Sequence, residues 1–232
     1  MIYLYAISKV ISGMHHVYCI SGLGADFRIF QQLQLHNATL HPIEWTMPDA
    51  GETLPQYAAR LAAQIKHPQP VLLGVSFGGM LATEISRIMP VQQTIIISSC
   101  KCKQELPAWM RTAGKLRLHK MIPYWMVTQF SSLNKYIFDT QSKAEDLYIK
   151  QMMLKDTHHL FVKRAVNMIL TWQAQTPAHN IMHIHGRADK LLLPKRVQAN
   201  YWLNDAGHFM IWNRADEVSQ YINAILDSLV KG

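Results

Sequence analysis

A serine between two glycines is the strongest chemical signal in this sequence. Ser76 stands in Gly74-Val75-Ser76-Phe77-Gly78, after an apolar run at 70–73 and before a helical pattern over 79–89. A serine at such a strand-to-helix turn is exposed at the carboxyl edge of a sheet, and the flanking glycines allow the backbone to approach closely. The helix that follows directs backbone N–H groups at a developing anion. We therefore predict that Ser76 is a nucleophile rather than part of a plain glycine-rich turn.

A nucleophilic serine needs a base, and the sequence has a histidine and an aspartate at suitable places. Asp189 follows a short apolar strand pattern in a Gly-Arg-Ala-Asp turn, and His208 lies in a loop after another such pattern. The order Ser, Asp, His is the one expected when the three residues are built on strand ends of one α/β sheet. His208 would accept the proton of Ser76, and Asp189 would hold the imidazole in the required tautomer. Asp205, near His208, is the alternative acid.

Four short motifs together resemble the α/β-hydrolase superfamily, and more narrowly its small bacterial lid-bearing serine hydrolases of the esterase type. The motifs are Ser21-Gly22-Leu23-Gly24-Ala25-Asp26, Gly74-Val75-Ser76-Phe77-Gly78-Gly79, His185-Gly186-Arg187-Ala188-Asp189 and Gly207-His208-Phe209. The resemblance implies the α/β-hydrolase fold, the triad Ser76, Asp189 and His208, and an oxyanion hole of backbone N–H groups. In many relatives the first motif begins His-Gly, whereas here it begins Ser-Gly. The amides of Leu23 and Phe77 are the expected donors, with Gly24 as the alternative to Leu23.

The apolar patterns along the chain alternate between strand and helix. Such alternation, with near-continuous apolar strands, predicts a mostly parallel sheet flanked by helices on both faces. The expected strands are 16–20, 40–45, 70–75, 94–98, 181–184 and 201–203, and the expected helices are 26–35, 54–65, 79–89 and 214–230.

The alternation is interrupted between residues 99 and 178. An unstructured loop of that length is improbable, so we predict a helical lid at 99–178, inserted into an α/β-hydrolase core of residues 1–98 and 179–232. The insertion is rich in methionine and tryptophan, which suit an adaptable apolar pocket wall. We predict that Trp109, Trp125 and Met126 line the substrate pocket. The alternative is that these side chains pack the helices of the lid itself.

Composition and charge limit the class of protein. The 232 residues are 49% apolar, which indicates one folded domain with a substantial core. The net charge of +8 is concentrated in 99–178, which carries 12 Lys and Arg against 5 Asp and Glu. That excess would attract an anionic substrate or a membrane surface, or it is a solvated helix face. The basic residues lie apart and carry no nucleic-acid-binding motif, so nucleic acid is not an expected partner, and no apolar run is long enough for a transmembrane helix.

The cysteines and the first residues bear on localisation. Cys19, Cys100 and Cys102 are an odd number without metal-ligand spacing, so we expect reduced thiols in a cytoplasmic protein. Residues 1–13 have no basic leader and no convincing cleavage site, so we expect no signal peptide. A natural start at Met14 is the alternative.

No metal or organic cofactor is predicted. The adjacent pairs His15-His16 and His158-His159 cannot share a face of a strand or helix. His183 and His185 alternate along one strand and could in principle bind a metal ion, but they fall where the sheet needs ordinary strand residues.

The sequence thus predicts a serine hydrolase that cleaves a small-molecule ester of a small or medium apolar acyl group through an acyl-enzyme. The fold also hosts acyltransferases, C–C hydrolases and lyases, and cofactor-free haloperoxidases, which remain alternatives. An alternative of another class is a ligand-binding signalling protein that turns its ligand over slowly. A monomer and a homodimer are equally compatible with the sequence.

Overall fold

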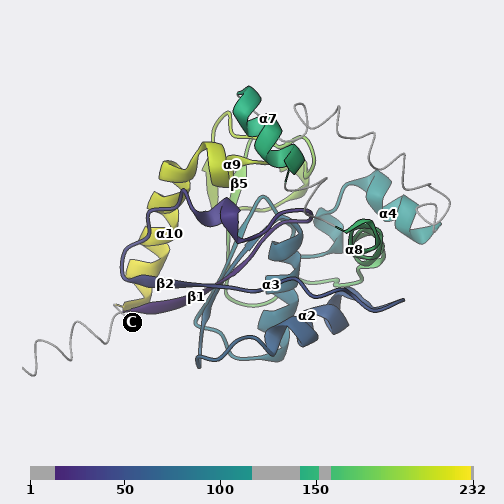
Figure 1. Ribbon diagram of the computed structural model, residues 1–232, viewed down its shortest axis with the longest axis horizontal. Coiled ribbons are helices and arrows are strands. Elements are labelled where there is room, and N and C mark those ends of the chain that lie inside the picture. The colour runs from purple at the N-terminus through teal and green to yellow at the C-terminus, as the bar shows by residue number, and fades with distance from the viewer. Residues whose placement is uncertain (1–13, 117–141, 152–157, 231–232) are drawn as a thin grey trace, which may run out of the picture.

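The computed structural model describes residues 14–116, 142–151 and 158–230 (Figure 1). Among them, six strands form one sheet in the order β2-β1-β3-β4-β5-β6, and every neighbouring pair is parallel. The strands are β1 (His15–Ile20), β2 (Ala38–Pro42), β3 (Val71–Val75), β4 (Gln93–Ile97), β5 (Ile181–Gly186) and β6 (Tyr201–Leu203). The predicted alternation of strands and helices is confirmed, because parallel neighbours require a crossover between consecutive strands.

The central strand β3 leads directly to Ser76. β3 and β4 are buried along their whole length, which explains their almost unbroken runs of Val, Leu and Ile. Because all six strands run the same way, their carboxyl ends meet at one edge of the sheet. Ser76 directly follows β3 and Asp189 follows the end of β5, so the fold brings both to that edge.

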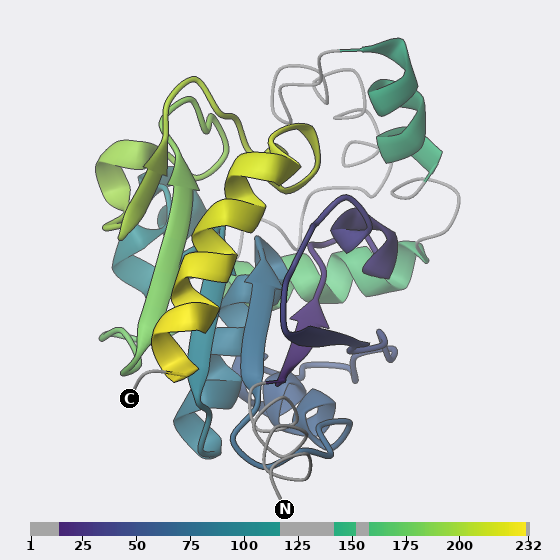
Figure 2. The same cartoon turned by 90° about the vertical axis from the view of Figure 1, so that its left-hand side faces the viewer.

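Two helical layers cover the sheet. Alternate residues of β1 point to opposite faces, with Tyr18 and Ile20 in the core on one side and Val17 and Cys19 in the core on the other. The first core is completed by α2 (Leu54–Ala62) and α3 (Phe77–Ile88), and the second by α9 (Met210–Asn213) and α10 (Ala215–Val230). Figure 2 shows α10 lying across its face of the sheet.

The described helices between residues 99 and 178 are α4 (Ala108–Lys115), α7 (Lys143–Lys150) and α8 (His159–Thr171). Helix α8 buries Phe161, Ala165 and Met168 in the same core as α2 and α3. Trp172, which follows α8, is buried and donates a hydrogen bond of 2.9 Å from Nε1 to Oε1 of Glu84 on α3. The last part of the predicted lid is therefore integral to the core layer, while the division of the chain into core and lid stays a prediction.

The predicted helix over 26–35 is wrong. The chain forms only a short 3-10 helix, η1 (Phe27–Phe30). Beyond it, the amides of Gln34 and His36 bond to side chains of α10, Ser219 Oγ and Asn223 Oδ1, each at 2.9 Å. Because these tertiary bonds replace helical ones, the segment stays extended and β2 begins earlier than predicted.

The three cysteines are buried and free, as predicted. Burial raises the pKa of the Cys19 and Cys100 thiols, which keeps them protonated. None of the helices in the described ranges has the length and apolar character needed to span a bilayer.

Candidate active site

Ser76 occupies a strained turn between β3 and α3. Its backbone has φ of 53° and ψ of −117°, in a region that residues with a side chain rarely adopt. The turn is held from both sides, because the Ser76 amide donates to the Ile97 carbonyl at 2.9 Å and the Ser76 carbonyl accepts from Ser99 Oγ at 2.6 Å. The Gly79 amide, in the first turn of α3, also donates to that carbonyl at 3.0 Å. The surroundings thus impose a backbone conformation that projects the serine side chain away from both strand and helix.

The two glycines of this turn are required by close backbone contacts. A Cβ on Gly74 would lie 2.6 Å from the Cα of Gly79, inside the turn itself. A Cβ on Gly78 would overlap the carbonyl groups of Ile20 and Ser21 at the end of β1, with the Ile20 carbonyl carbon 2.6 Å away. The Gly-x-Ser-x-Gly pattern is therefore the condition for packing the start of α3 against β1.

His208 joins Ser76 to Asp189 by two hydrogen bonds. Ser76 Oγ lies 3.0 Å from His208 Nε2, and His208 Nδ1 lies 2.8 Å from Asp189 Oδ2. A carboxylate accepts from Nδ1–H, which leaves the Nε2 lone pair free to accept the serine proton. The three residues that the sequence singled out are thus connected in series, with His208 hydrogen-bonded to both of the others.

Asp189 is held as a buried carboxylate. Its Oδ1 accepts from the amides of Leu191 and Leu192, both at 2.9 Å, and the residue is 2% exposed. Burial by itself would raise the pKa of Asp189, but the charge and hydrogen bond of His208, with smaller contributions from His185 and the Leu192 amide, hold the pKa below its ordinary value. The group is therefore ionised at neutral pH and orients the imidazole.

The turn that carries Asp189 is tied to the loop that carries His208. The Arg187 amide donates to the Leu203 carbonyl at 2.9 Å, and the Ala188 amide donates to the Ala206 carbonyl at 3.0 Å. The alternative acid, Asp205, is exposed in the same loop, at a positive φ of 53°. In the described residues Asp189, rather than Asp205, is the carboxylate in contact with His208.

Two buried histidines lie behind the acid. His185 Nε2 is 2.8 Å from the Leu192 carbonyl, so this nitrogen carries the proton, and Nδ1 then accepts from His183 Nε2 at 3.1 Å. Burial is the main cause that lowers the pKa of both imidazoles, which are therefore neutral. His185 Nε2 also lies 3.5 Å from Asp189 Oδ2. His183 and His185 thus place uncharged polar groups next to Asp189.

The loop after β1 lies directly beside the nucleophile. A Cβ on Gly22 would lie 3.5 Å from the Cβ of Ser76, so the Gly22–Leu23 backbone adjoins the serine. Ser21 Oγ donates to the Ala25 carbonyl at 2.8 Å, and the Ala25 amide donates to the Gly22 carbonyl at 3.0 Å, which holds the loop in a tight turn. Phe77 opens α3, and the first N–H groups of a helix have no acceptor within it. These positions suit the predicted roles of the Leu23 and Phe77 amides, which stay predictions.

Aromatic side chains that the sequence analysis did not select pack around Phe77, the residue after Ser76. Trp45, which follows β2, stacks on Phe77 with ring centroids 5.7 Å apart and meets Phe161 of α8 edge-on at 5.3 Å. Its Nε1 donates to the Ala25 carbonyl at 2.8 Å, which links it to the loop after β1. The position of Trp45 just past a strand end was the available signal, since the carboxyl ends of the strands share one edge.

Of the three residues predicted to line the pocket, the structure describes only Trp109. Trp109 lies on α4 and is 61% exposed, so it is not part of the buried aromatic cluster around Trp45. Trp125 and Met126 lie outside the described residues. A pocket role for these three residues therefore stays a prediction.

Comparisons with known proteins agree with this architecture. No family model matches the sequence, and no curated protein matches it either. Solved structures do match over nearly the whole chain. An esterase from Exiguobacterium antarcticum superposes with a TM-score of 0.67 at 14% identity, over 93% of this chain and 93% of that one.

Two further structures give the same result. A thermophilic esterase from Thermogutta terrifontis has a TM-score of 0.64 at 16% identity, over 94% of this chain and 91% of that one. ClbQ from the colibactin NRPS/PKS pathway has a TM-score of 0.65 at 16% identity, over 93% of this chain and 98% of that one. Likeness at such low identity establishes architecture: the parallel sheet, its flanking helices and the serine turn after β3 show that this chain has the α/β-hydrolase fold.

Proposed function

We propose that this protein is a serine hydrolase that cleaves carboxylic esters of small or medium apolar acyl groups. The observation that carries the proposal is the hydrogen-bonded series from Ser76 through His208 to Asp189, with the serine on a strained turn at the carboxyl edge of the sheet. The esterases of similar fold support the reaction class.

The chemistry follows from the positions of these groups. His208 takes the proton of Ser76 as Oγ attacks the ester carbonyl, and Asp189 stabilises the imidazolium that results. The amides of Leu23 and Phe77 would donate to the oxyanion of the tetrahedral intermediate. His208 then gives its proton to the leaving alcohol. In the second half of the reaction, water attacks the acyl-enzyme with His208 as general base.

The preference for an apolar acyl group rests on the aromatic cluster. Trp45 is partly exposed and packs on Phe77, whose amide is a proposed oxyanion donor, so an acyl chain bound at this carbonyl site could contact the indole of Trp45. Removing such a chain from water gains about 0.8 kcal/mol per CH₂ group. Trp45→Ala should therefore reduce the increase in kcat/KM with acyl length more than it changes kcat/KM for the acetate ester.

A fluorophosphonate probe tests the nucleophile directly. The wild-type protein should be labelled at Ser76, and Ser76→Ala should abolish both labelling and hydrolysis of chromogenic esters from acetate to palmitate. His208→Ala should lower turnover by about 10³-fold or more, because base and nucleophile act as one unit. Ser86→Ala is the matched control, since Ser86 lies on α3 with its hydroxyl bonded to the Thr83 carbonyl.

Three results would contradict the proposal. One is robust labelling of the Ser76→Ala protein at another serine. Another is a single burst of acylation without turnover, which would indicate the slow ligand-binding protein. A third is release of product only when an alcohol or amine acceptor is added, which would indicate acyl transfer in place of hydrolysis.

A further inference from the structure

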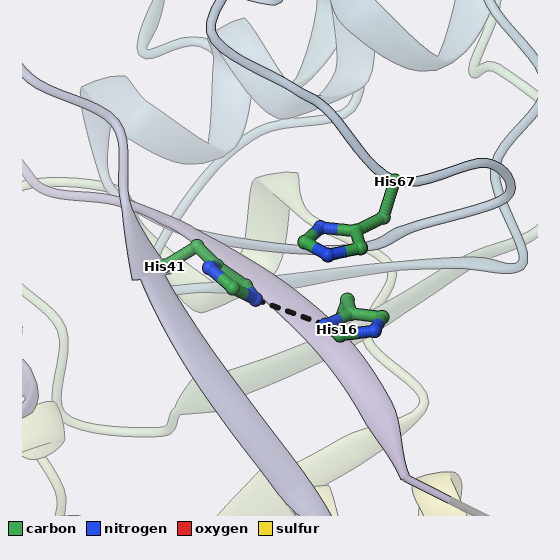
Figure 3. Close-up of side chains that lie close together, drawn as sticks. All are labelled: His16, His41 and His67. Atoms are coloured by element: carbon green, nitrogen blue, oxygen red, sulfur yellow. Dashed lines mark hydrogen bonds between the residues drawn. The ribbon is translucent and has the colours of Figure 1, made fainter.

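Three imidazoles from separate segments meet on one face of the sheet (Figure 3). His16 lies on β1, His41 on the edge strand β2, and His67 in the loop between α2 and β3. His16 Nδ1 is 3.0 Å from His41 Nε2, and the rings of His16 and His67 are stacked with centroids 3.5 Å apart. One nitrogen from each residue can be chosen so that no two are more than 4.8 Å apart.

Strand register explains how this cluster forms. Tyr18 on β1 lies opposite His41 on β2, so His16, Tyr18 and His41 share one face of the sheet. The loop that returns from α2 to β3 crosses the same face and adds His67. The three residues thus bring together side chains from the edge strand, from its neighbour in the sheet and from a loop.

The cluster is distant from the candidate active site. Val17 pairs with Val71 at the start of β3, whereas Ser76 follows the end of that strand. At about 3.3 Å per residue, His16 and Ser76 are therefore separated by roughly 20 Å along the sheet. The histidines lie toward the amino edge and the serine at the carboxyl edge, so the cluster has no part in the triad.

The chemistry of the three side chains suits a transition-metal ion. Neutral imidazole is a good ligand for Zn²⁺, Cu²⁺ and Ni²⁺, and three histidines with an open fourth position form a known type of zinc site. All three residues are half-buried, so an ion can enter from solvent and keep a water ligand.

Tyr18 supplies a partner behind one of the ligands. Its hydroxyl oxygen lies 2.8 Å from His67 Nδ1 and accepts from the Lys66 amide, also at 2.8 Å. A histidine that binds a metal through one nitrogen commonly donates the N–H of the other nitrogen to an oxygen. The same oxygen also accepts from the His67 amide at 3.3 Å, so for Tyr18 to accept from His67 Nδ1–H this longer bond has to give way, which would leave His67 Nε2 as the ligand atom.

We propose that His16, His41 and His67 bind one divalent transition-metal ion, with Zn²⁺ as the probe. Nitrogens around tetrahedral zinc are about 3.3 Å apart, given Zn–N distances near 2.0–2.1 Å. The 3.0 Å pair already has nearly that spacing, and His67, on a loop, has to close the remaining gap by about 1.5 Å as its ring leaves the stack. The bound ion ties the edge strand to β1 and to the loop before β3, and so stabilises the fold.

Isothermal titration of chelator-treated protein with ZnCl₂ tests the site. We expect one Zn²⁺ per chain and a rise in Tm of about 5 °C or more when free Zn²⁺ is 100 times Kd. His41→Gln and His67→Gln should each raise Kd at least about 10-fold, and Tyr18→Phe should raise it about 10- to 100-fold. Circular dichroism of each variant shows that the fold is retained.

The matched controls are His36→Gln and His158→Gln. Both residues are exposed and neither belongs to the cluster, so their Kd should equal that of the wild type. Co²⁺ gives a second readout, because tetrahedral nitrogen ligation produces strong visible absorption that His67→Gln should remove. Two results would overturn the proposal. One is a Kd for Zn²⁺ weaker than about 1 mM. The other is Zn²⁺ binding that persists in His41→Gln and His67→Gln but is lost in a control variant.

Discussion

Gly78→Ala tests whether the close packing of α3 on β1 is what holds the serine turn. Gly78 is the second residue of α3, at the point where the helix passes the end of β1. A Cβ there would overlap the carbonyl groups of Ile20 and Ser21, and the Ile20 carbonyl carbon would be 2.6 Å away. These are backbone atoms of a buried strand, so no side-chain rotation relieves the overlap.

Two effects of opposite sign determine the expected magnitude. In an unhindered helix, alanine is more favourable than glycine by about 1 kcal/mol. Against that, ordinary carbon contacts begin near 3.4 Å, so α3 and β1 would have to separate by nearly 1 Å. Overpacking of this kind costs about 1–3 kcal/mol, and more where backbone must move. Because the overlap is with buried backbone, its cost lies at the upper end of this range or above it. After the gain of about 1 kcal/mol from alanine is subtracted, we expect the free energy of unfolding to fall by about 1–3 kcal/mol.

The same displacement should reduce catalysis. β1 leads directly into the loop that carries Leu23, and α3 begins with Phe77, so separating the two elements moves the proposed oxyanion donors apart. A misplacement of about 1 Å can lower turnover by roughly 10²-fold. The loss of kcat should therefore exceed what the unfolded fraction accounts for.

Urea unfolding followed by circular dichroism, with ester turnover measured on the same samples, checks both effects. Gly22→Ala is the control for stability, because its Cβ would lie 3.5 Å from the Cβ of Ser76 and 3.6 Å from the Val75 carbonyl, which are ordinary contacts. Its free energy of unfolding should stay within about 0.5 kcal/mol of wild type. A Gly78→Ala protein as stable as wild type would refute the packing argument.

Three further predictions concern buried polar groups. Asp189→Asn should lower kcat by up to roughly 10⁴-fold, because the amide favours the wrong tautomer of His208. Asp205→Asn should have little effect on ester turnover. The reverse pattern would show that the acid is misassigned. Because the pKa of Asp189 is lower in the folded protein than its unfolded value of about 3.9, its ionisation stabilises the fold above that pH, and this contribution is lost as the pH falls through the folded pKa. Urea melts should therefore show the stability difference between wild type and Asp189→Asn narrowing below about pH 4, and a constant difference would argue against the charged acid. Trp172→Phe removes the indole donor to Glu84 and should lower the free energy of unfolding by about 1–2 kcal/mol. Thermal and urea stability equal to those of the wild type would contradict this prediction.

Local sequence patterns explain why Ser76, Asp189 and His208 could be selected from the sequence. A side chain at position 74 or 78 would overlap neighbouring backbone, so the two glycines mark the serine turn in the sequence. Asp189 and His208 each follow a short apolar strand, and parallel strands bring such positions to one edge. The alternation of strands and helices, and the three residues Ser76, Asp189 and His208 that meet at this edge, could therefore be predicted from the sequence.

Contacts between segments that are distant in the chain could not be predicted from the sequence. The choice of Asp189 over Asp205 depends on burial: one turn folds under His208, and the other carboxylate faces solvent. The helix expected after the first strand failed because side chains of α10, nearly 200 residues later in the chain, bind the amides that a helix would have used.

The sequence by itself determined which side chains meet at the carboxyl edge, since Ser76, Asp189 and His208 each follow an apolar strand pattern that predicts their place there. Only the tertiary structure decided what surrounds it, because packing brings Trp45 against Phe161 across more than a hundred residues. The histidine cluster is the clearest case. Neighbours in sequence, His15 and His16, point to opposite faces, whereas strand register and a returning loop bring His16 together with His41 and His67.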